Sequence, residues 1–423
     1  MKIIAANKIW FQRAINVLPL FILKFAAAGL TFIFHYFTVR TISPEQYGVL
    51  TIALSCLVFM VVFAKQGIEQ SVVRFFAPLS TQMLGPYYLH VAGMILKNSI
   101  FLAVLVLLFA PFLQHTILKF DDTGTVLWIV YLFAIAQSLL ALNSTVFKSR
   151  ECASWSLIFS GIITYCLTLI AFLFIHVESS IEVLLILAGS AFIAVAFSAV
   201  ILHRKFSVLS GAEQLSKEKA LAFKNSSKIL FWASLCSLVV EHAGVLIMGR
   251  YESLENIGIY GVVFKVSLLM SFPLIILNIV NAPKFARYHS NRQHDKIRAL
   301  YKSMTLPLVL IATVAFVFLC LFSKEVLSLF GQDYIKGEKL LLILAIGQWW
   351  NLSCGPVVSL LVMSGHEKYH RRNTIGIALF SLALMLFYTP VYGSLAVAII
   401  TAMGLILLNL ISLFQVHKYV LKK

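Results

Sequence analysis

Residues 40–48, with the sequence RTISPEQYG, lie between two long apolar runs, and residues 250–258, RYESLENIG, lie between two others. The two stretches are about half of the 423-residue chain apart. An ungapped alignment places identical residues at Arg40 and Arg250, Ser43 and Ser253, Glu45 and Glu255, and Gly48 and Gly258. At the same offset Arg74-Phe75 falls on Lys284-Phe285. The pattern indicates an internal duplication, so we interpret the chain as two related halves.

Each copy has the composition of a short turn between two membrane helices, and we refer to residues 40–48 and 250–258 as the two repeat turns. Pro44 and Gly48 punctuate the first repeat turn. Ser43 and Ser253 carry a side-chain oxygen that can cap the helix that follows. The sequence therefore predicts a helix start within both repeat turns.

The composition is that of a membrane protein. The chain is 60% hydrophobic and 12% charged, with a mean hydropathy of +0.92, whereas a soluble domain carries roughly 25% charged residues. Apolar runs near the length of a membrane-spanning helix recur along the chain. We predict an all-α polytopic membrane protein with about twelve transmembrane helices in two pseudo-symmetric six-helix lobes around a central cavity. The predicted spans are 15–37, 46–66, 98–116, 124–146, 153–175, 182–202, 229–249, 258–281, 303–323, 339–362, 373–390 and 394–416.

The distribution of the 34 lysines and arginines orients these spans. When the N-terminus is placed in the cytoplasm, nearly all basic residues outside the spans fall on cytoplasmic segments. The opposite side holds only Arg40, Lys119, Arg250, Lys324, Lys336 and Lys339. This bias predicts cytoplasmic termini. The net charge of +17 is then explained by orientation and by contact with anionic lipid heads, and nucleic acid is not required.

Two less apolar segments indicate how the chain is divided. Residues 203–228 are polar and basic, and we predict that they form a cytoplasmic linker between an N-terminal lobe, 1–202, and a C-terminal lobe, 229–423. Six helices in each lobe give both halves the same orientation in the membrane, an arrangement in which transporters place substrate between the halves. Residues 75–97 suggest an interfacial or re-entrant segment.

Away from the span ends, three charged side chains lie deep inside predicted spans: Lys24, Glu241 and Lys265. A charge at that depth costs about 2.5–3.5 kcal/mol on insertion scales, so it is expected to face a cavity or a partner. Lys24 and Lys265 are candidates for attracting an anionic group into a water-filled cavity, and Glu241 is a candidate site for a coupling cation or proton. The alternative for Glu241 is a structural pairing with Lys265 or His242 that fixes helix packing.

Arginines at span ends form a second candidate group. Arg40 and Arg250 end their spans on the outer side, where they either gate an outer mouth and bind a phosphate, or extend to lipid head groups. Arg74 and Lys284 occupy matching cytoplasmic positions, and the same alternatives apply to them.

The sequence argues against an enzyme. The loops between spans are too short to fold into an extramembrane catalytic domain. We find neither a phosphate-cradling glycine-rich loop nor an ATPase motif, and the six cysteines lack metal-ligand spacing. We therefore expect a transporter without catalytic residues, metal or cofactor, driven by an ion gradient, the substrate gradient or the voltage.

These features together resemble the bacterial lipid-linked oligosaccharide flippases, or O-antigen and polysaccharide-biosynthesis translocases, of the multidrug/oligosaccharidyl-lipid/polysaccharide exporter superfamily. The motifs that carry the resemblance are Val39-Arg40, Glu45-Gln46-Tyr47-Gly48, Gly67 through Phe75, Met248-Gly249-Arg250-Tyr251, Ile257-Gly258-Ile259-Tyr260, Pro283-Lys284-Phe285-Ala286, Leu329-Phe330-Gly331, Gly347-Gln348, Gly355-Pro356, Met363-Ser364-Gly365-His366 and Pro390-Val391-Tyr392-Gly393. The sequence departs from the family pattern at Gly244, where relatives often carry an acidic residue.

The resemblance implies an inner-membrane protein that moves an undecaprenyl-pyrophosphate-linked oligosaccharide repeat unit from the cytoplasmic to the periplasmic leaflet. It also implies a V-shaped arrangement of two lobes and, as partners, a polysaccharide polymerase and a chain-length regulator. The same fold also serves ion-coupled multidrug or cation antiporters. A cation cavity should be lined by acids, and Glu241 is the one acid in the interior of a predicted span. A membrane polymerase or ligase is disfavoured by the lack of a large outer loop, and a scaffold leaves the lysines within spans unexplained.

Overall fold

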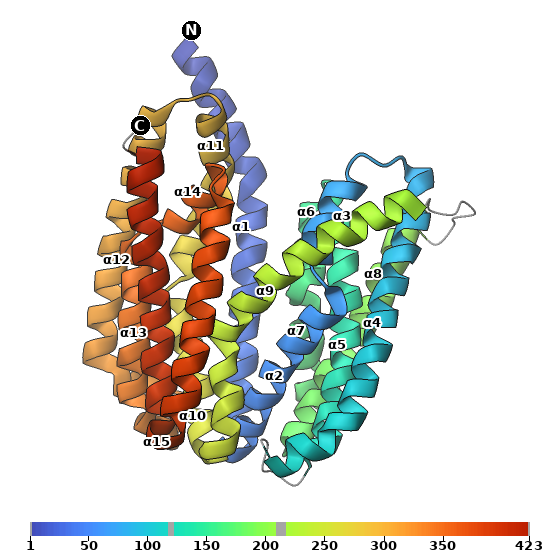
Figure 1. The fold of residues 1–423 in the computed structure, drawn as a ribbon, viewed down its shortest axis with the longest axis vertical. Coiled ribbons are helices and arrows are strands. Elements are labelled where there is room, and N and C mark those ends of the chain that lie inside the picture. The colour runs from blue at the N-terminus through green and yellow to red at the C-terminus, as the bar shows by residue number, and fades with distance from the viewer. Residues whose placement is uncertain (1, 117–121, 209–216, 422–423) are drawn as a thin grey trace. The chain divides into compact units, whose positions relative to one another are not determined.

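The computed structural model describes residues 2–116, 122–208 and 217–421, and in this part of the chain all regular secondary structure is helical (Figure 1). Contacts divide the chain into two compact units, with boundaries within α2 (Pro44–Lys65) and within α9 (Lys217–Tyr251). The first unit also contains α1 (Lys2–Thr41), α3 (Ile68–Phe76), α4 (Thr81–Thr116), α5 (Thr123–Ser149), α6 (Ala153–Leu157), η1 (Ile158–Ile162), α7 (Ile163–Phe174) and α8 (Ser180–Phe206). The second contains α10 (Leu254–Leu269), α11 (Phe272–Ser290), α12 (His294–Ser328), η2 (Gln332–Gly337), α13 (Glu338–Ser353), α14 (Val357–Met363), α15 (Glu367–Val416) and η3 (His417–Leu421).

The helices have the length and composition of a multi-pass membrane protein. Among the described residues, eight helices are long and apolar enough to cross a bilayer. The pairs α10–α11 and α13–α14, bent by 46° and 45°, bring the number to 10 if each is one span. Helix α15 is broken at Gly393 (φ 54°, ψ −133°), and each limb is longer than the ~30 Å hydrocarbon core. The twelve predicted spans fall in order on α1, α2, α4, α5, α6–α7, α8, α9, α10–α11, α12, α13–α14 and the two limbs of α15.

The side chains on the outside of these helices are those that lipid would solvate. Leu173 and Phe174 at the end of α7 are 81% and 83% exposed, and Leu310 on α12 is 67% exposed. In water, exposed apolar surface on this scale would drive aggregation. The exposure pattern therefore agrees with a bilayer as the surrounding medium.

The interpretation of 75–97 as an interfacial or re-entrant segment is wrong for most of its length. Helix α4 begins at Thr81 and continues without a break through Pro86 to Thr116. Leu84 and Tyr88 in this stretch are buried. Burial against the neighbouring helices therefore outweighs the local turn signal of Gly85-Pro86.

The predicted linker 203–228 is helical at both ends, because α8 extends to Phe206 and α9 begins at Lys217. Its middle part, residues 209–216, lies outside the described residues. The lobe boundaries at 202 and 229 stay a prediction.

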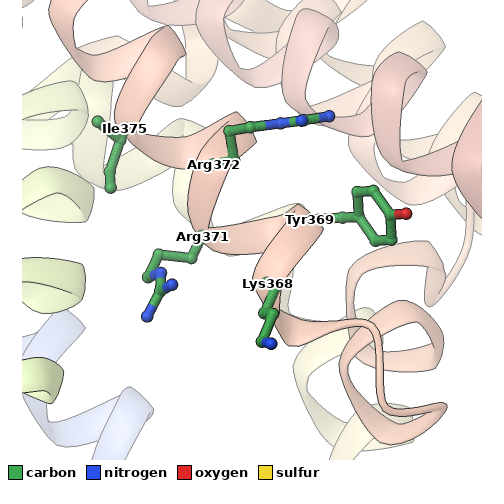
Figure 2. Close-up of a pocket in the computed structure, with 5 residues that line it drawn as sticks. All are labelled: Lys368, Tyr369, Arg371, Arg372 and Ile375. Carbon is green, nitrogen blue, oxygen red and sulfur yellow. The ribbon is translucent and has the colours of Figure 1, made fainter.

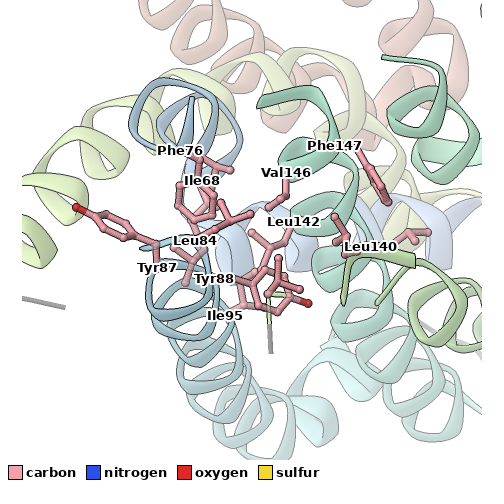
Figure 3. Close-up of a cluster of buried hydrophobic side chains, with 14 of the residues drawn as sticks. Ile68, Phe76, Leu84, Tyr87, Tyr88, Ile95, Leu140, Leu142, Val146 and Phe147 are labelled. Carbon is pink, nitrogen blue, oxygen red and sulfur yellow. The ribbon is translucent and has the colours of Figure 1, made fainter. Parts of the chain in front are cut away.

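The first unit is built around α5, which packs most extensively on α8 and also contacts α3 and α6. Figure 3 shows the apolar core that α3, α4 and α5 share. A polar chain crosses this core: the Tyr88 hydroxyl donates to Asn143 Oδ1 at 2.8 Å, and Asn143 Nδ2 donates to the Ser198 hydroxyl at 2.7 Å. These bonds satisfy the amide of Asn143 where water is excluded.

Arg150, which follows α5, fixes the turn between α3 and α4. Its guanidinium donates to the carbonyl oxygen of Leu79 at 2.8 Å and to that of Ser80 at 3.5 Å. Partial burial lowers the pKa of Arg150, and the two carbonyl acceptors offset part of the cost of removing this charge from water.

The second unit is a bundle in which α13 packs between α12 and α15. At the end nearest the C-terminus, Phe285, Ile297 and Val357 form a buried cluster with residues of α15 and η3. The Tyr301 hydroxyl donates to the Cys354 carbonyl at 2.8 Å and so ties α12 to the turn between α13 and α14.

The repeat turns pack against each other in a reciprocal way within the second unit. A Cβ atom on Gly48 would overlap the carbonyl oxygen of Leu254, and a Cβ atom on Gly258 would overlap that of Pro44. Pro44 and Leu254 occupy equivalent positions of the two copies, as do the glycines. The contact therefore has an approximate two-fold axis between α2 and α10, as the duplication predicts.

The predicted helix caps are confirmed. The backbone N–H of Gln46 donates to the Ser43 hydroxyl at 3.2 Å, and that of Asn256 donates to the Ser253 hydroxyl at 3.2 Å. Each serine satisfies one of the N–H groups that a helix start leaves unpaired.

Candidate functional site: charged side chains in α9 and α10

Three titratable side chains gather where α9 and α10 run through the second unit. Glu241 and His242 are neighbours in the C-terminal third of α9, and Lys265 lies in the last turns of α10. The charge of Lys265 acts on both Glu241 and His242. The His242 ring packs edge-on against Phe264, with ring centroids 6.4 Å apart.

Glu241 and Lys265 are close without forming a salt bridge. They interact electrostatically, yet the described residues provide neither of them with an ion-pair partner within 4.0 Å. Glu241 is exposed, and Lys265 and His242 are partly exposed. An apolar helix pair that keeps an acid and a base accessible and apart leaves both groups able to bind a third charge.

The face of α9 that carries Glu241 has an exposed part and a buried part. Ser234, Ser237 and Glu241 are exposed, whereas Gly244 and Val245 are buried. The missing side chain of Gly244 matters for packing, because a Cβ atom there would overlap the side chain of Val397 on α15. The departure at Gly244 thus lies at a helix–helix contact.

Lys24, the other lysine within a predicted span, lies on α1 in the first unit and is partly exposed. It has no ion-pair partner within 4.0 Å among the described residues. Helix α1 packs on α6 and α7 through Phe34, whose ring lies 5.4 Å from Tyr165 and 6.0 Å from Phe172.

The predicted arginines lie at helix ends and are exposed. The guanidinium carbon of Arg40 lies 5.0 Å from the centroid of the Tyr36 ring, and that of Arg250 lies 5.6 Å from the Tyr251 ring. Arg74 on α3 has the same relation to Phe75 at 6.0 Å. Arginines held over aromatic rings at span ends suit either head-group contact or capture of a phosphate.

Lys284, the counterpart of Arg74 in the second copy, donates to Asn281 Oδ1 at 2.8 Å on α11. Of all predicted site residues, the structure brings together Glu241 and Lys265. Lys24, Arg40 and Arg74 occupy separate parts of the first unit.

One functional feature was missed in the sequence. Glu252, in the second repeat turn, accepts a hydrogen bond from the backbone N–H of Ser394 at 2.8 Å and another from Asn256 Nδ2 at 2.7 Å. It thereby holds the break of α15 at Gly393 against the start of α10. The sequence could have identified Glu252, because this acid aligns with the apolar Ile42 when the two repeat turns are compared.

In the described residues, the apolar spans and the order of bent and broken helices are those of a multi-pass membrane protein. Solved structures support this class. The lipid II flippase MurJ in an inward closed conformation matches with a TM-score of 0.74 and 15% sequence identity, covering 94% of this chain and 87% of MurJ. An inward-facing multidrug resistance MATE family transporter of the MOP superfamily matches with a TM-score of 0.73 and 10% identity, covering 94% of each chain.

The MATE multidrug transporter DinF-BH matches with a TM-score of 0.68 and 14% identity over 96% of this chain and 95% of that one. A search of curated proteins finds no match. The profile of the polysaccharide biosynthesis protein family matches residues 14–289. The chain belongs to this family, and its fold is that of the flippases and exporters of the MOP superfamily.

Proposed function

We propose that this protein flips an undecaprenyl-pyrophosphate-linked oligosaccharide repeat unit, of O-antigen or a related surface polysaccharide, from the cytoplasmic to the periplasmic leaflet of a bacterial inner membrane. Membership of the polysaccharide biosynthesis family and the flippase-like fold support the substrate class. The observation that carries the proposal is Lys265, a partly exposed lysine in an apolar helix that forms no ion pair within 4.0 Å among the described residues.

The chemistry of such a substrate requires both a polar path and cations. Each sugar hydroxyl costs several kcal/mol if it enters hydrocarbon without a hydrogen bond, so the sugars need a wet cavity while the prenyl tail stays in lipid. The pyrophosphate needs cations that do not have to leave a salt bridge before they bind it. Lys24 and Lys265 provide them in this proposal, and opening of the protein alternately to each side completes the transfer.

Transport in sealed vesicles tests the proposal. Purified protein is reconstituted with a labelled undecaprenyl-pyrophosphate oligosaccharide, and its arrival in the opposite leaflet is followed with and without a proton or sodium gradient. We expect protein-dependent transfer that fails in Lys24→Ala and Lys265→Ala. Lys302→Ala, which removes an exposed cation from α12, is the matched control and should transfer normally. Full transfer by both span variants would contradict the role of the lysines.

A second candidate function is an ion-coupled antiporter of cationic drugs, which Glu241 favours as an exposed acid within an apolar helix. In that case a gradient should drive efflux of a cationic dye from the same vesicles, and the lipid-linked sugar should not move. Under either function, Glu241→Gln should remove the dependence on the coupling ion. An unchanged ion dependence would leave Glu241 with a packing role.

We further propose cytoplasmic termini and an association with a polysaccharide polymerase and a chain-length regulator. The distribution of basic residues supports the orientation, and the family supports the partners. Cysteine labelling of residue positions near the two ends of the chain in intact cells tests the orientation, since cytoplasmic ends should resist an impermeant reagent.

A further inference from the structure

A basic cavity opens beside the first turns of α15. It has a volume of about 570 Å³ and is lined by Lys368, Tyr369, Arg371, Arg372 and Ile375 (Figure 2). The three cations follow the spacing i, i+3 and i+4, which gathers their side chains around one turn. Figure 2 shows Lys368 and Arg371 extending from one side of the helix and Arg372 from the other.

These cations lack an acidic partner. Within the described residues, none of Lys368, Arg371 and Arg372 forms an ion pair within 4.0 Å, although Glu367 begins the same helix. All three side chains are exposed. The charge of the group is therefore available to a ligand.

The three cations lie at the start of α15, where positive charge is destabilising unless an anion is bound. The N-terminus of a helix carries a partial positive charge, so cations in the first turns are destabilising and an anion is stabilising. Lys368 and Arg371 lie within the first five residues of α15. An anion in the cavity would relieve repulsion among the three side chains and from the helix end.

An aromatic stack holds part of the cavity in place. The guanidinium carbon of Arg372 lies 5.6 Å from the centroid of the Tyr369 ring. Tyr369 stacks on Tyr419 of η3 at 5.0 Å and 14°, and on His366 at 5.9 Å and 25°. His366 and Tyr419 are also in contact, with ring centroids 5.7 Å apart, so the three rings form one cluster. Tyr369 therefore gives Arg372 a packed support, which reduces the entropy lost when a ligand binds.

A second basic cavity of the second unit differs in charge. It has a volume of about 330 Å³ and is lined by Arg292, Gln293, His294, Asp295, Lys296 and Arg298, so that one acid lies among the cations. An acid in the lining offsets part of the positive potential. The cavity at α15 is lined by three cations and by the uncharged Tyr369 and Ile375, and no acid is part of its lining.

We propose that Lys368, Arg371 and Arg372 bind the phosphate group of a lipid head at the cytoplasmic surface of the membrane. Phosphate oxygens accept several hydrogen bonds at once, and arginine presents paired donors that match them. Basic pockets next to membrane helices on the cytoplasmic side are suited to anionic head groups. The phosphate has two sources, a bilayer phospholipid or the polyprenyl pyrophosphate carrier of the substrate, and the second source rests on the proposed function.

Binding to the purified full-length protein in neutral detergent tests this site. Phosphatidylglycerol and undecaprenyl pyrophosphate are titrated separately, with phosphatidylcholine as the uncharged reference, and bound lipid is counted by native mass spectrometry. The triple variant Lys368→Gln/Arg371→Gln/Arg372→Gln is compared with Lys224→Gln/Lys228→Gln/Lys302→Gln, which removes the same charge from exposed positions elsewhere on the predicted cytoplasmic side. We expect the cavity variant to bind at least one of the two anionic lipids at least tenfold more weakly, and the control to bind as the wild type does.

Each result decides the proposal. A loss for phosphatidylglycerol alone assigns the site to bilayer lipid, and a larger loss for undecaprenyl pyrophosphate assigns it to the carrier. Wild-type binding of both lipids by the cavity variant, or an equal loss in the control, overturns the proposal. If the triple variant elutes as aggregate, Arg371→Gln alone is measured in the same way. Lipid binding is measured independently of transport. A protein that binds lipid at this site but does not flip the lipid-linked sugar would contradict the flippase proposal and not the proposed binding site.

Discussion

Ile42 in the first repeat turn and Glu252 in the second occupy equivalent positions of the duplicated unit. Ile42 is 5% exposed and packs as an apolar side chain. Glu252 accepts the N–H of Ser394 and holds the break in α15. The next acidic position differs too: Glu255 pairs with Lys336 at 2.6 Å, whereas Glu45 has no ion pair within 4.0 Å among the described residues. Both copies keep the reciprocal glycine contact, and the second copy adds polar contacts from Glu252 to α15 and from Glu255 to η2.

Substitutions at the glycine contact that both copies share should have the largest effect on the free energy of unfolding. Gly48→Ala and Gly258→Ala each place a Cβ atom against a backbone carbonyl that cannot move away cheaply. We expect each to lower the free energy of unfolding by about 3 kcal/mol or more, measured from thermal or denaturant unfolding in detergent. Gly189→Ala in α8, where a Cβ atom meets no atom within 4 Å, is the control and should be neutral or slightly stabilising. A large loss from one glycine and none from the other would contradict the two-fold contact.

Substitution of Glu252, the first difference between the copies, should have an intermediate effect on the free energy of unfolding. Glu252→Ala removes a charged acceptor from the Ser394 N–H and from Asn256, and we expect a loss of about 1.5–3 kcal/mol. Glu252→Gln keeps one acceptor oxygen and should lose less. Combining Glu252→Ala with Asn256→Ala should cost less than the sum of the single variants, because they share a hydrogen bond. Strict additivity would show that the bond to Asn256 contributes little.

Substitution of Glu255, the second difference between the copies, should have the smallest effect on stability. Lys336 is well exposed, so its pairing with Glu255 is screened by water and is expected to contribute little to stability. Glu255→Gln should therefore shift the unfolding midpoint slightly at low salt and not at high salt, whereas Glu45→Gln should leave it unchanged in both. Equal effects of the two substitutions would remove the distinction between the copies at this position.

Much of the fold follows from local patterns in the sequence. The apolar runs place the spans, and the duplicated Ser43 and Ser253 predict caps that the structure contains. Helix α4 was misjudged because Gly85-Pro86 is a strong local turn signal, and the burial of Leu84 that overrides it depends on helices far away in the sequence.

The candidate site was also only partly predictable from the sequence. A charge within an apolar run identifies Glu241 and Lys265 individually, but the spacing along one helix does not reveal which residue of another helix lies opposite. Their proximity therefore required the structure. The i, i+3, i+4 spacing of Lys368, Arg371 and Arg372 was visible in the sequence, and what the structure adds is the cavity and the stacked ring of Tyr369.

The reciprocal contact between Gly48 and Leu254 and between Gly258 and Pro44 has the form of an isologous dimer interface that happens to lie within one polypeptide. In such an interface every surface meets its own counterpart, so two separate half-length chains could have associated through it before they were joined. Joining the halves then freed each copy to change independently everywhere except at the axis. Glu252, away from the axis, differs from its counterpart Ile42. Gly48 and Gly258, at the axis, are the same in both halves because a side chain at either position would overlap the other copy.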